Sequence, residues 1–452
     1  MKIIIAGNGK VGSTLVRELS AEGYDLTVID SDSQVLEDAM EKYDVIGLGG
    51  NCAAMDTLRQ ADVGNAELLI AAAGQDEVNL LCCMTAHGLN SGIHTIARIR
   101  NPEYIEQAYD MHDVFGLSMT VNPERQTAVE IERLLGFPGF MRRESFARGR
   151  VEIVELRVDE KSRLDGAALH SLSAVVKCQV LVCAVLRDGA VTMPGGSFVL
   201  KAGDRVFVTA PTSALVTLLK NMGIITRKVN RVMLAGGGRI SYYLAQQLSK
   251  DGIQVKLMEK DYDRCLELAG LLPGVSVIHG DASSKTAMER EGLASYDALV
   301  SLTGLDELNV MISMYAGSVG VPQVITKLSR EENSAILENL PIGSVVCPKE
   351  LCCNTIVRYV RAMQNQTGAA VSVHTIARGQ AEATEFLVDD ATLHRGETLR
   401  SISLKPDVLV ACIIHGGKTE IPDGGSSFAS GDTLVIVTNA DTVIGQLNDI
   451  FA

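Results

Sequence analysis

The chain repeats itself at a spacing of about 229 residues. Residues 2–12 read KIIIAGNGKVG, and residues 231–241 read RVMLAGGGRIS. Other pairs lie 228 to 230 residues apart: Asp30 and Glu259, the DEVN of 76–79 and the DELN of 306–309, Gly203 and Gly431. Because the spacing changes so little along the unit, the chain is a tandem duplication almost free of insertions. We therefore expect a fold with two copies of each element.

The 452 residues are enough for about three or four domains. The duplication makes four the natural number, and we expect the domains at 1–140, 141–227, 228–368 and 369–452. No apolar run approaches the roughly 20 residues of a membrane span. A strand from Ile3 leaves no room for a signal peptide, so a cytosolic or peripheral protein is expected.

Charge and cysteine usage narrow the possible partners. The net charge of −14 disfavours nucleic acid, because phosphate contacts need clustered Lys and Arg. The ten cysteines include the adjacent pairs Cys82–Cys83 and Cys352–Cys353 but no CxxC pair, and no His stands at ligand spacing beside them. This pattern argues against a metal site and favours small core residues in a reducing compartment.

Apolar runs alternate with helical patterns over the first 120 residues. The expected strands are 3–6, 26–30, 44–48, 68–73, 94–100 and 117–121. The expected helices are 10–22, 33–42, 53–60, 77–88 and 102–111. This alternation predicts a Rossmann-like, doubly wound parallel sheet covered on both faces. Further along each copy, short strands with hairpin turns predict a small module rich in β-structure.

One amphipathic helix is expected after the last strand of each sheet, at 124–136 and at 349–363. The first carries Ala128, Ile131 and Leu134 on one face. Such a face fits a contact with a second chain, and it also fits packing on the helix's own domain. The sequence leaves both possibilities open.

The first copy contains a GxGxxG pattern between a strand and a helix, which is the context that dinucleotide binding requires. Gly7 permits the tight turn, Gly9 lets the backbone approach a pyrophosphate, and Gly12 lets the helix lie close to the sheet. The helix N-terminus then offers N–H groups to the phosphates. Asp30 ends the second strand, where its carboxylate can accept ribose hydroxyls and would repel a 2′-phosphate.

Other residues should lie at the same strand ends. Arg98 and Arg100 are two apart in an expected strand and so point to one face, where Arg98 can meet a phosphate chain. An ion pair at the surface is the alternative role. Asp76 and Asn79 are expected to cap the helix that they begin. The backbone of Ala73–Gly74 is expected to contact the ligand.

The second glycine loop is altered. Gly236 and Gly238 are kept, but Ser241 stands in place of the third glycine. Glu259 replaces Asp30 and keeps a carboxylate for the ribose, while Lys327 stands where Arg98 does. We expect a second nucleotide site with different selectivity.

Together, the segments AGNGKVG, TVID, DEVN, ARIRNPEY and GDRVFV make the whole chain resemble the TrkA family, the peripheral regulatory subunits of Trk potassium uptake. Its members carry two RCK (KTN) units, each with a nucleotide-binding half and a small α+β RCK-C half. The resemblance implies a cytoplasmic gating ring on the inner face of the membrane, attached to a K⁺-translocating subunit of the TrkH/TrkG type. It also implies NAD(H) or ATP/ADP as regulatory ligands. Together with the duplication, it leads us to expect a homotetramer and no catalytic residue.

The resemblance also implies ligand contacts by position. In the first copy these are Gly7, Asn8, Gly9, Lys10, Val11, Asp30, Asn51, Ala73, Gly74 and Arg98. In the second copy they are Gly236, Gly237, Gly238, Arg239, Ile240, Glu259, Asp281, Thr303 and Lys327. Asn51 departs from the Asp common in the family, as Ser241 departs from glycine. Glu124 matches a position that related rings use near the phosphates, but its counterpart is Lys349.

Two alternatives remain at this stage. An NAD-dependent oxidoreductase would need a substrate domain with a proton donor facing the nicotinamide. The eight histidines do not recur between the copies, and the small modules offer little room for such a domain. A ring that senses a second messenger such as cyclic di-AMP through the RCK-C modules is neither shown nor excluded by the sequence.

Overall fold

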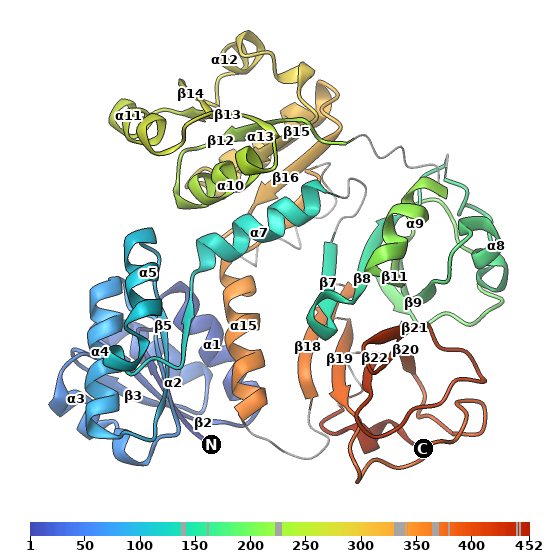
Figure 1. Ribbon diagram of the computed structural model, residues 1–452, viewed down its shortest axis with the longest axis horizontal. Coiled ribbons are helices and arrows are strands. Elements are labelled where there is room, and N and C mark those ends of the chain that lie inside the picture. Colours follow the sequence, from blue (N-terminus) through green and yellow to red (C-terminus); the bar gives the residue numbers. More distant parts are fainter. Residues whose placement is uncertain are drawn as a thin grey trace. The chain divides into compact units, whose positions relative to one another are not determined.

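The structure, a computed structural model, describes residues 1–136, 142–160, 162–221, 228–329, 340, 342–363, 370–377, 380–439, 442 and 444–452. Two six-stranded and two five-stranded sheets lie in these residues (Figure 1). None of the helices in these ranges is both long and apolar enough to cross a membrane.

The first six-stranded sheet is wholly parallel, with the order β3-β2-β1-β4-β5-β6. Its strands are β1 (Lys2–Ala6), β2 (Asp25–Asp30), β3 (Ile46–Gly49), β4 (Leu68–Ala71), β5 (His94–Arg98) and β6 (Met119–Val121). The helices are α1 (Lys10–Ala21), α2 (Ser33–Lys42), α3 (Met55–Gln60), α4 (Asp76–Leu89), α5 (Pro102–Asp110) and α6 (His112–Phe115). Ile3, Ile4 and Ile5 are fully buried, which explains their unbroken apolar run in a sheet covered on both faces. The strand order reverses between β1 and β4, where such folds bind ligands.

The second six-stranded sheet repeats this order as β14-β13-β12-β15-β16-β17. Its strands are β12 (Arg231–Ala235), β13 (Gln254–Glu259), β14 (Ser276–His279), β15 (Ala298–Ser301), β16 (Gln323–Lys327) and β17 (Ser344–Val346). Its helices are α10 (Arg239–Lys250), α11 (Tyr262–Leu271), α12 (Lys285–Arg290) and α13 (Asp306–Ser318). The prediction of two Rossmann-like, doubly wound domains is therefore confirmed.

Each copy also contains a five-stranded antiparallel sheet, as expected for the small modules. The first, β10-β9-β11-β8-β7, is built from β7 (Arg142–Phe146), β8 (Val151–Arg157), β9 (Leu181–Arg187), β10 (Ala190–Thr192) and β11 (Arg205–Pro211). Two short helices, α8 (Leu172–Val176) and α9 (Leu215–Asn221), accompany it. The second, β18-β19-β22-β20-β21, is built from β18 (Ala370–Ile376), β19 (Ala381–Leu387), β20 (Val408–His415), β21 (Lys418–Glu420) and β22 (Thr433–Asn439).

The two small modules share a hydrophobic core. One buried cluster contains Phe146 and Ile153 from the first module together with Ala383 and Val437 from the second. The backbone N–H of Ala147 also donates to a carboxylate oxygen of Glu385 at 3.1 Å. The modules therefore stabilise each other.

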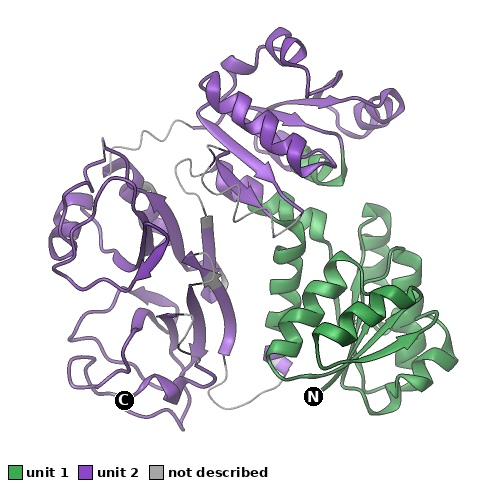
Figure 2. Cartoon of the chain, turned by 180° about the vertical axis from the view of Figure 1, so that it is seen from behind, with its two compact units in different colours: residues 1–130, 238–246, 347–360 green, residues 131–237, 247–346, 361–452 purple. Residues whose placement is uncertain are grey.

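The chain forms two compact units, which are coloured separately in Figure 2. Residues 1–130, 238–246 and 347–360 form unit 1, and residues 131–237, 247–346 and 361–452 form unit 2. Unit 1 thus combines the first nucleotide domain with segments of the second copy. The predicted boundaries at 140/141 and 368/369, as well as residue 227, lie outside the described residues.

Two long helices, α7 (Pro123–Leu135) and α15 (Pro348–Met363), follow the parallel sheets. Their apolar faces are already buried in the single chain, with Ala128 and Ile131 at 0% exposure. The exposed apolar face that a contact with a second chain would require is therefore not present on the described residues of these helices. Packing on the helix's own domain does not describe α15 either, because the Sγ of Cys353 lies 3.6 Å from the carbonyl oxygen of Val11 in the first copy.

The reverse contact occurs in unit 2. The side-chain amide of Gln323, on β16 of the second copy, donates to the carbonyl oxygen of Leu134 on α7 at 2.7 Å. In unit 1, Tyr359 of α15 also bonds His94 of the first copy at 3.0 Å. Each of the two long helices therefore contacts the nucleotide domain of the other copy.

Candidate functional site

The first glycine loop joins β1 to α1 and is shaped by close contacts. Gly7 has a φ of +97°, and a Cβ on it would lie 2.6 Å from the backbone nitrogen of Ala73. A Cβ on Gly12 would lie 1.9 Å from the carbonyl oxygen of Gly7. By contrast, a Cβ on Gly9 would have no atom within 4 Å. The loop is therefore closed at its two ends and open at Gly9, where the sequence predicts a pyrophosphate.

The N-terminus of α1 lies at Gly9, the open part of the loop. Gly9 is its N-cap, and no side chain accepts a hydrogen bond from the first turn. The N–H groups of a first helical turn have no partner within the helix, so they are available to an anion. Lys10 is exposed beside Gly9, whereas Asn8 and Val11 are buried.

Asp30 lies at the end of β2 and is tied to the loop. One of its carboxylate oxygens accepts the backbone N–H of Asn8 at 2.6 Å, and the other accepts that of Asp32 at 3.0 Å. Each carboxylate oxygen can accept a further hydrogen bond. These contacts hold the carboxylate where the sequence predicts a ribose, and they leave it able to accept the ribose hydroxyls.

Asn79 and Asp76 have roles other than the predicted helix capping, since the N-cap of α4 is Gln75 and no side chain caps it. The side chain of Asn79 is fully buried, accepts from the N–H of Ala73 at 2.8 Å and donates to the carbonyl of Arg98 at 2.8 Å. It thereby fixes the ends of β4 and β5 against each other. Asp76 accepts the backbone N–H groups of Arg100 at 2.8 Å and Asn101 at 2.7 Å. The capping prediction failed because these carboxylate and amide groups are used by the neighbouring strand end.

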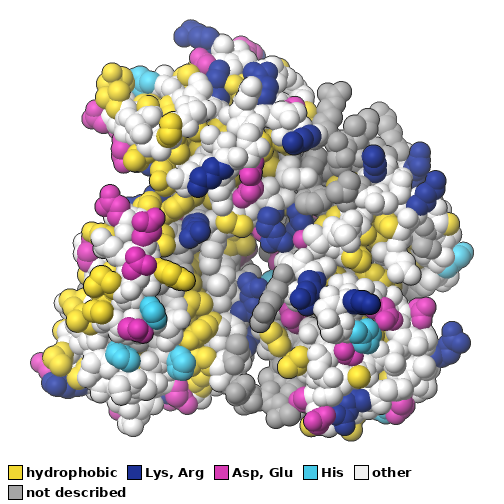
Figure 3. All heavy atoms as spheres, in the orientation of Figure 1, with side chains coloured by type: hydrophobic (Ala, Val, Ile, Leu, Met, Phe, Trp, Pro, Cys, Tyr) yellow, Lys and Arg dark blue, Asp and Glu magenta, His cyan; other side chains and the backbone are white. Residues whose placement is uncertain are grey.

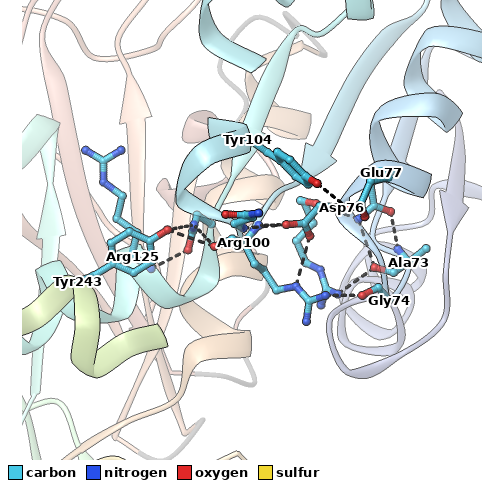
Figure 4. A network of polar contacts seen from close by, with 12 residues as sticks. Ala73, Gly74, Asp76, Glu77, Arg100, Tyr104, Arg125 and Tyr243 are labelled. Atoms are coloured by element: carbon cyan, nitrogen blue, oxygen red, sulfur yellow. Dashed lines mark hydrogen bonds and ion pairs between the residues drawn. The ribbon is translucent and has the colours of Figure 1, made fainter. Parts of the chain in front are cut away.

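The two arginines reach the backbone at the end of β4, but by different routes. The Arg98 guanidinium donates to the carbonyl of Ala73 at 2.9 Å, and that of Arg100 donates to the carbonyl of Gly74. β5 ends at Arg98, so placing Arg100 in the strand was wrong. Arg100 instead lies over Asp76, with its Nε 3.4 Å from the carboxylate (Figure 4).

Several buried polar atoms near this loop have no hydrogen-bond partner among the described residues: Arg98 Nε, Glu124 Oε2 and Asn8 Oδ1. Burial lowers the pKa of Arg98, and the neighbouring Arg100 lowers it further. A buried N–H donor without a partner is costly, and an anionic ligand could accept a hydrogen bond from the Nε of Arg98. Together with the open glycine loop, this arrangement fits the phosphates of a nucleotide.

Asn51 is exposed just beyond β3, where its side chain accepts the backbone N–H of Ala53 at 3.0 Å. Its counterpart Asp281 accepts that of Ser283 at 2.8 Å. Hydrogen bonds from the side chain and then the backbone of Ser283 lower the pKa of Asp281. The two residues therefore shape equivalent turns. One carries a charge and the other does not, so the two turns differ in charge.

The second glycine loop keeps the geometry of the first with one compensated change. Gly236 has a φ of +103°, and the carboxylate of Glu259 accepts the N–H of Gly237 at 2.6 Å. Glu259 is one methylene longer than Asp30, and a Cβ on Gly237 would lie 2.9 Å from its carboxylate oxygen. The longer acid thus occupies the space that the side chain of Asn8 uses in the first copy.

The remaining residues of the second site follow the same plan. Lys327 donates to the carbonyl of Thr303, as Arg98 does to that of Ala73. Asn309 accepts from Thr303 and donates to the carbonyl of Lys327 at 3.0 Å. Gly238 and Arg239 are exposed, whereas Ile240 and Ser241 are buried. The second loop is therefore also open at its middle glycine.

Eight of the ten cysteines are buried, as predicted, whereas Cys178 and Cys347 are half-buried. Cys82, Cys83, Cys352 and Cys353 are all at most 1% exposed, and burial raises the pKa of Cys83 to about 12. Across the described part of the chain, no group of three or more His, Cys, Asp or Glu side chains could hold a metal ion.

The sequence did not predict a role for two residues of the site region. Asn122 precedes α7, and Tyr243 lies on α10 of the second copy, yet their side chains are hydrogen-bonded at 3.1 Å. They are 121 positions apart, and neither belongs to a motif. No local pattern could have revealed this contact.

Comparison with known proteins agrees with this geometry. The TrkA-N domain family matches residues 3–123 and 232–348, and the TrkA-C domain family matches residues 153–223. A Trk system potassium uptake protein TrkA homolog of Archaeoglobus fulgidus is 32% identical over 452 residues, covering 100% of both chains. The Trk system potassium uptake protein TrkA of Vibrio alginolyticus is 29% identical over 457 residues, covering 100% of this chain and 98% of the relative.

Solved structures show the same fold. A chain of the GsuK channel bound to NAD aligns with a TM-score of 0.61 at 17% identity, over 97% of this chain and 77% of that chain. A chain of the human SLO3 gating ring aligns with a TM-score of 0.50 at 12% identity, over 98% of this chain and 100% of that chain. The duplicated glycine loops, the paired small modules and the match along the full length lead to one conclusion: the chain belongs to the TrkA family of Trk system potassium uptake proteins.

Proposed function

We propose that this protein is a cytoplasmic, nucleotide-sensing regulatory subunit that controls potassium uptake through a membrane K⁺-translocating subunit of the TrkH/TrkG type. The observation that carries the proposal is the first crevice. There an uncapped helix N-terminus, the carboxylate of Asp30 and the half-buried Arg98 with its unpartnered Nε lie at neighbouring strand ends. This is the chemistry of an adenine nucleotide site, in a chain whose relatives belong to a potassium uptake system.

The proposed ligand contacts are those expected from the sequence. In the first site they are Gly7 to Val11, Asp30, Asn51, Ala73, Gly74 and Arg98, and in the second they are Gly236 to Ile240, Glu259, Asp281, Thr303 and Lys327. NAD(H) and ATP/ADP both carry the ribose and pyrophosphate that these groups would hold. NAD bound to the GsuK channel supports this choice of ligand class.

Modest energies per site would be enough for control. Moving a two-state partner from mostly closed to mostly open needs a preference of roughly 10⁴-fold, or about 5.5 kcal/mol. In a tetramer, eight crevices sharing this preference would each supply under about 1 kcal/mol. Small differences in the phosphate contacts of Arg98 and Lys327 are of this size.

Replacing Arg98 with alanine should weaken nucleotide control of K⁺ flux while leaving the complex with the membrane partner assembled. The variant loses a charge-assisted hydrogen bond, and we expect roughly tenfold weaker nucleotide binding at the first site. The measurement is K⁺ flux through the reconstituted complex, with ATP, ADP and NADH titrated in turn. Arg59→Ala, at an exposed position on α3, serves as the matched control. Flux that ignores all three nucleotides in the wild-type protein would remove the regulatory proposal.

The same titrations examine the oxidoreductase alternative. Nucleotide binding without turnover agrees with the regulatory role. Steady consumption of NADH together with a simple carbonyl substrate would favour a dehydrogenase instead.

We further propose that the protein forms a homo-oligomer, with four chains expected. Because α7 and α15 are covered, the support comes from a hydrophobic ridge that recurs on α4 and α13. Leu81 and Met84 on α4 are 52% and 46% exposed, and Met311 and Met314 on α13 are 68% and 37% exposed. Figure 3 shows hydrophobic side chains on the surface over the α4 side of the first domain. A ridge present in both copies fits repeated contacts between chains.

Charging this ridge should break the oligomer. We expect the wild-type protein to scatter light as a tetramer at micromolar concentration, and Leu81→Glu with Met311→Glu to reduce its mass to that of a smaller species. Leu266→Glu, on the exposed face of α11, controls for added charge. A wild-type monomer would contradict the proposal.

A further inference from the structure

The hydroxyl group of Tyr243 connects three segments of unit 1. It accepts a hydrogen bond from the side-chain amide of Asn122 at 3.1 Å and donates one to the carbonyl oxygen of Arg100 at 3.1 Å. The ring is only 7% exposed, and burial raises the pKa of Tyr243, so the hydroxyl keeps the proton that it donates. Figure 4 shows Tyr243 at one side of a network that continues through Arg100 to Asp76 and Gly74.

The contact with Arg100 acts on a single rigid group. The carbonyl of Arg100 and the N–H of Asn101 belong to one planar peptide unit. Tyr243 holds the carbonyl side of this unit, and Asp76 accepts its N–H at 2.7 Å. A displacement of the tyrosine hydroxyl therefore moves the peptide against the first residue of α4.

The same movement reaches the first nucleotide crevice. The guanidinium of Arg100 donates to the carbonyl of Gly74, which follows Ala73 at the end of β4. Arg98, two residues before Arg100, donates to the carbonyl of Ala73 at 2.9 Å. The position of the Arg100 peptide thus determines how the backbone at the ligand-facing end of β4 is held.

Tyr243 is also connected to the second glycine loop through the helix that carries it. It lies on α10, one turn after Gly238 and Arg239, and residues 238–246 belong to unit 1 with the first nucleotide domain. An anion bound at the N-terminus of α10 would pull on this helix directly. Any shift of its first turns would be passed to the hydroxyl of Tyr243.

The connection is not matched by the other copy. At the offset of 229 residues, Thr14 on α1 corresponds to Tyr243. The hydroxyl of Thr14 donates to the carbonyl of Lys10 in its own helix at 3.0 Å. The first phosphate helix therefore has no side chain at this position that reaches a second segment.

We propose that Tyr243 is a positioning residue that couples occupancy of the second glycine loop to nucleotide affinity in the first crevice. The inference rests on the proposed nucleotide binding and extends it: the two sites of one chain are thermodynamically linked through α10, Arg100 and Asp76. By linkage, each ligand changes the affinity of the other by the same factor.

Calorimetric titration of the full chain with ADP and with NADH tests the coupling through a double-mutant cycle. Gly238→Val is designed to disable the second loop, because the new side chain would fill the open space over the N-terminus of α10. The fold should tolerate it, since the Cβ position of Gly238 is open and its φ suits a side chain. We expect this change to alter the affinity of the first crevice by about fivefold or more in the wild-type background. In the Tyr243→Phe background the ratio should fall to below about twofold, since the ring remains and only the hydroxyl is lost. Tyr242→Phe is the matched control and should keep the wild-type ratio.

The outcomes separate the two proposals. A calorimetric binding step that disappears in Gly9→Val belongs to the first crevice, and its affinity is the quantity used to measure the coupling. If that binding step exists but Gly238→Val changes its affinity by the same ratio in the Tyr243→Phe and wild-type backgrounds, the role of Tyr243 is overturned. A ratio near one in the wild-type protein overturns it as well. If Gly9→Val titrates like the wild type, the proposed nucleotide site itself has failed.

Discussion

Replacing Gly9 with valine is expected to abolish nucleotide binding in the first crevice, with at least a hundredfold loss of affinity, about 2.7 kcal/mol. The backbone of Gly9 has a φ of −71° and a ψ of −159°, which any residue adopts. The new side chain would enter the open space over the N-terminus of α1, where a pyrophosphate would otherwise contact the backbone N–H groups. Binding should be lost while the free energy of unfolding stays nearly unchanged.

Calorimetry with ADP and NADH measures the affinity, and thermal unfolding without nucleotide checks the fold. Gly64→Val is the control, because its Cβ position is also open and it lies in the turn before β4. An affinity at the first crevice equal to that of the wild type would show that the phosphates do not lie over this loop.

The third glycine of the motif should respond in the opposite way. Gly12→Ser is expected to destabilise the protein by about 3 kcal/mol even without ligand. Its Cβ would lie 1.9 Å from the carbonyl oxygen of Gly7, so α1 would have to move away from β1. The second copy already has Ser241 at this position, fully buried, which indicates that α10 leaves room for a Cβ.

Thermal unfolding of the full chain measures this difference. Gly12→Ser should lower the Tm of the first transition by several degrees, whereas Ser241→Gly should change it little. Gly88→Ala on α4 is the control, since a methyl group there meets no atom within 4 Å. Equal Tm values for Gly12→Ser and the wild type would mean that the two phosphate helices are packed alike.

The parts of this molecule that could be predicted are those determined by local patterns. The apolar run Ile3 to Ile5 and the glycine loop that follows it specify a buried strand and a phosphate helix without reference to any other segment. Duplication strengthens this inference, because each pattern appears twice. The doubly wound sheets were predictable for that reason, and their strand ends differ from the prediction by only a few residues.

The roles of single polar residues were harder to predict. The sequence around Asp76 is typical of a helix cap, but its carboxylate accepts hydrogen bonds from two backbone N–H groups just after β5. Tyr243 has no local pattern, and its partners lie in the other copy. These interactions depend on how distant segments meet, which hydrophobic periodicity does not encode.

The exchange of the long helices means that the two halves of the sequence are not two separable proteins. A chain ended near residue 227 would keep α1 but lose α15, whose Cys353 and Tyr359 contact the first nucleotide domain. The apolar surface exposed by the loss of α15 would favour association with another copy of the fragment. Ligand preferences of the individual sites are therefore best assigned in the intact chain, with one glycine loop disabled at a time. If the duplication joined two identical chains, the contacts of α7 and α15 with the other copy would correspond to contacts between those two chains.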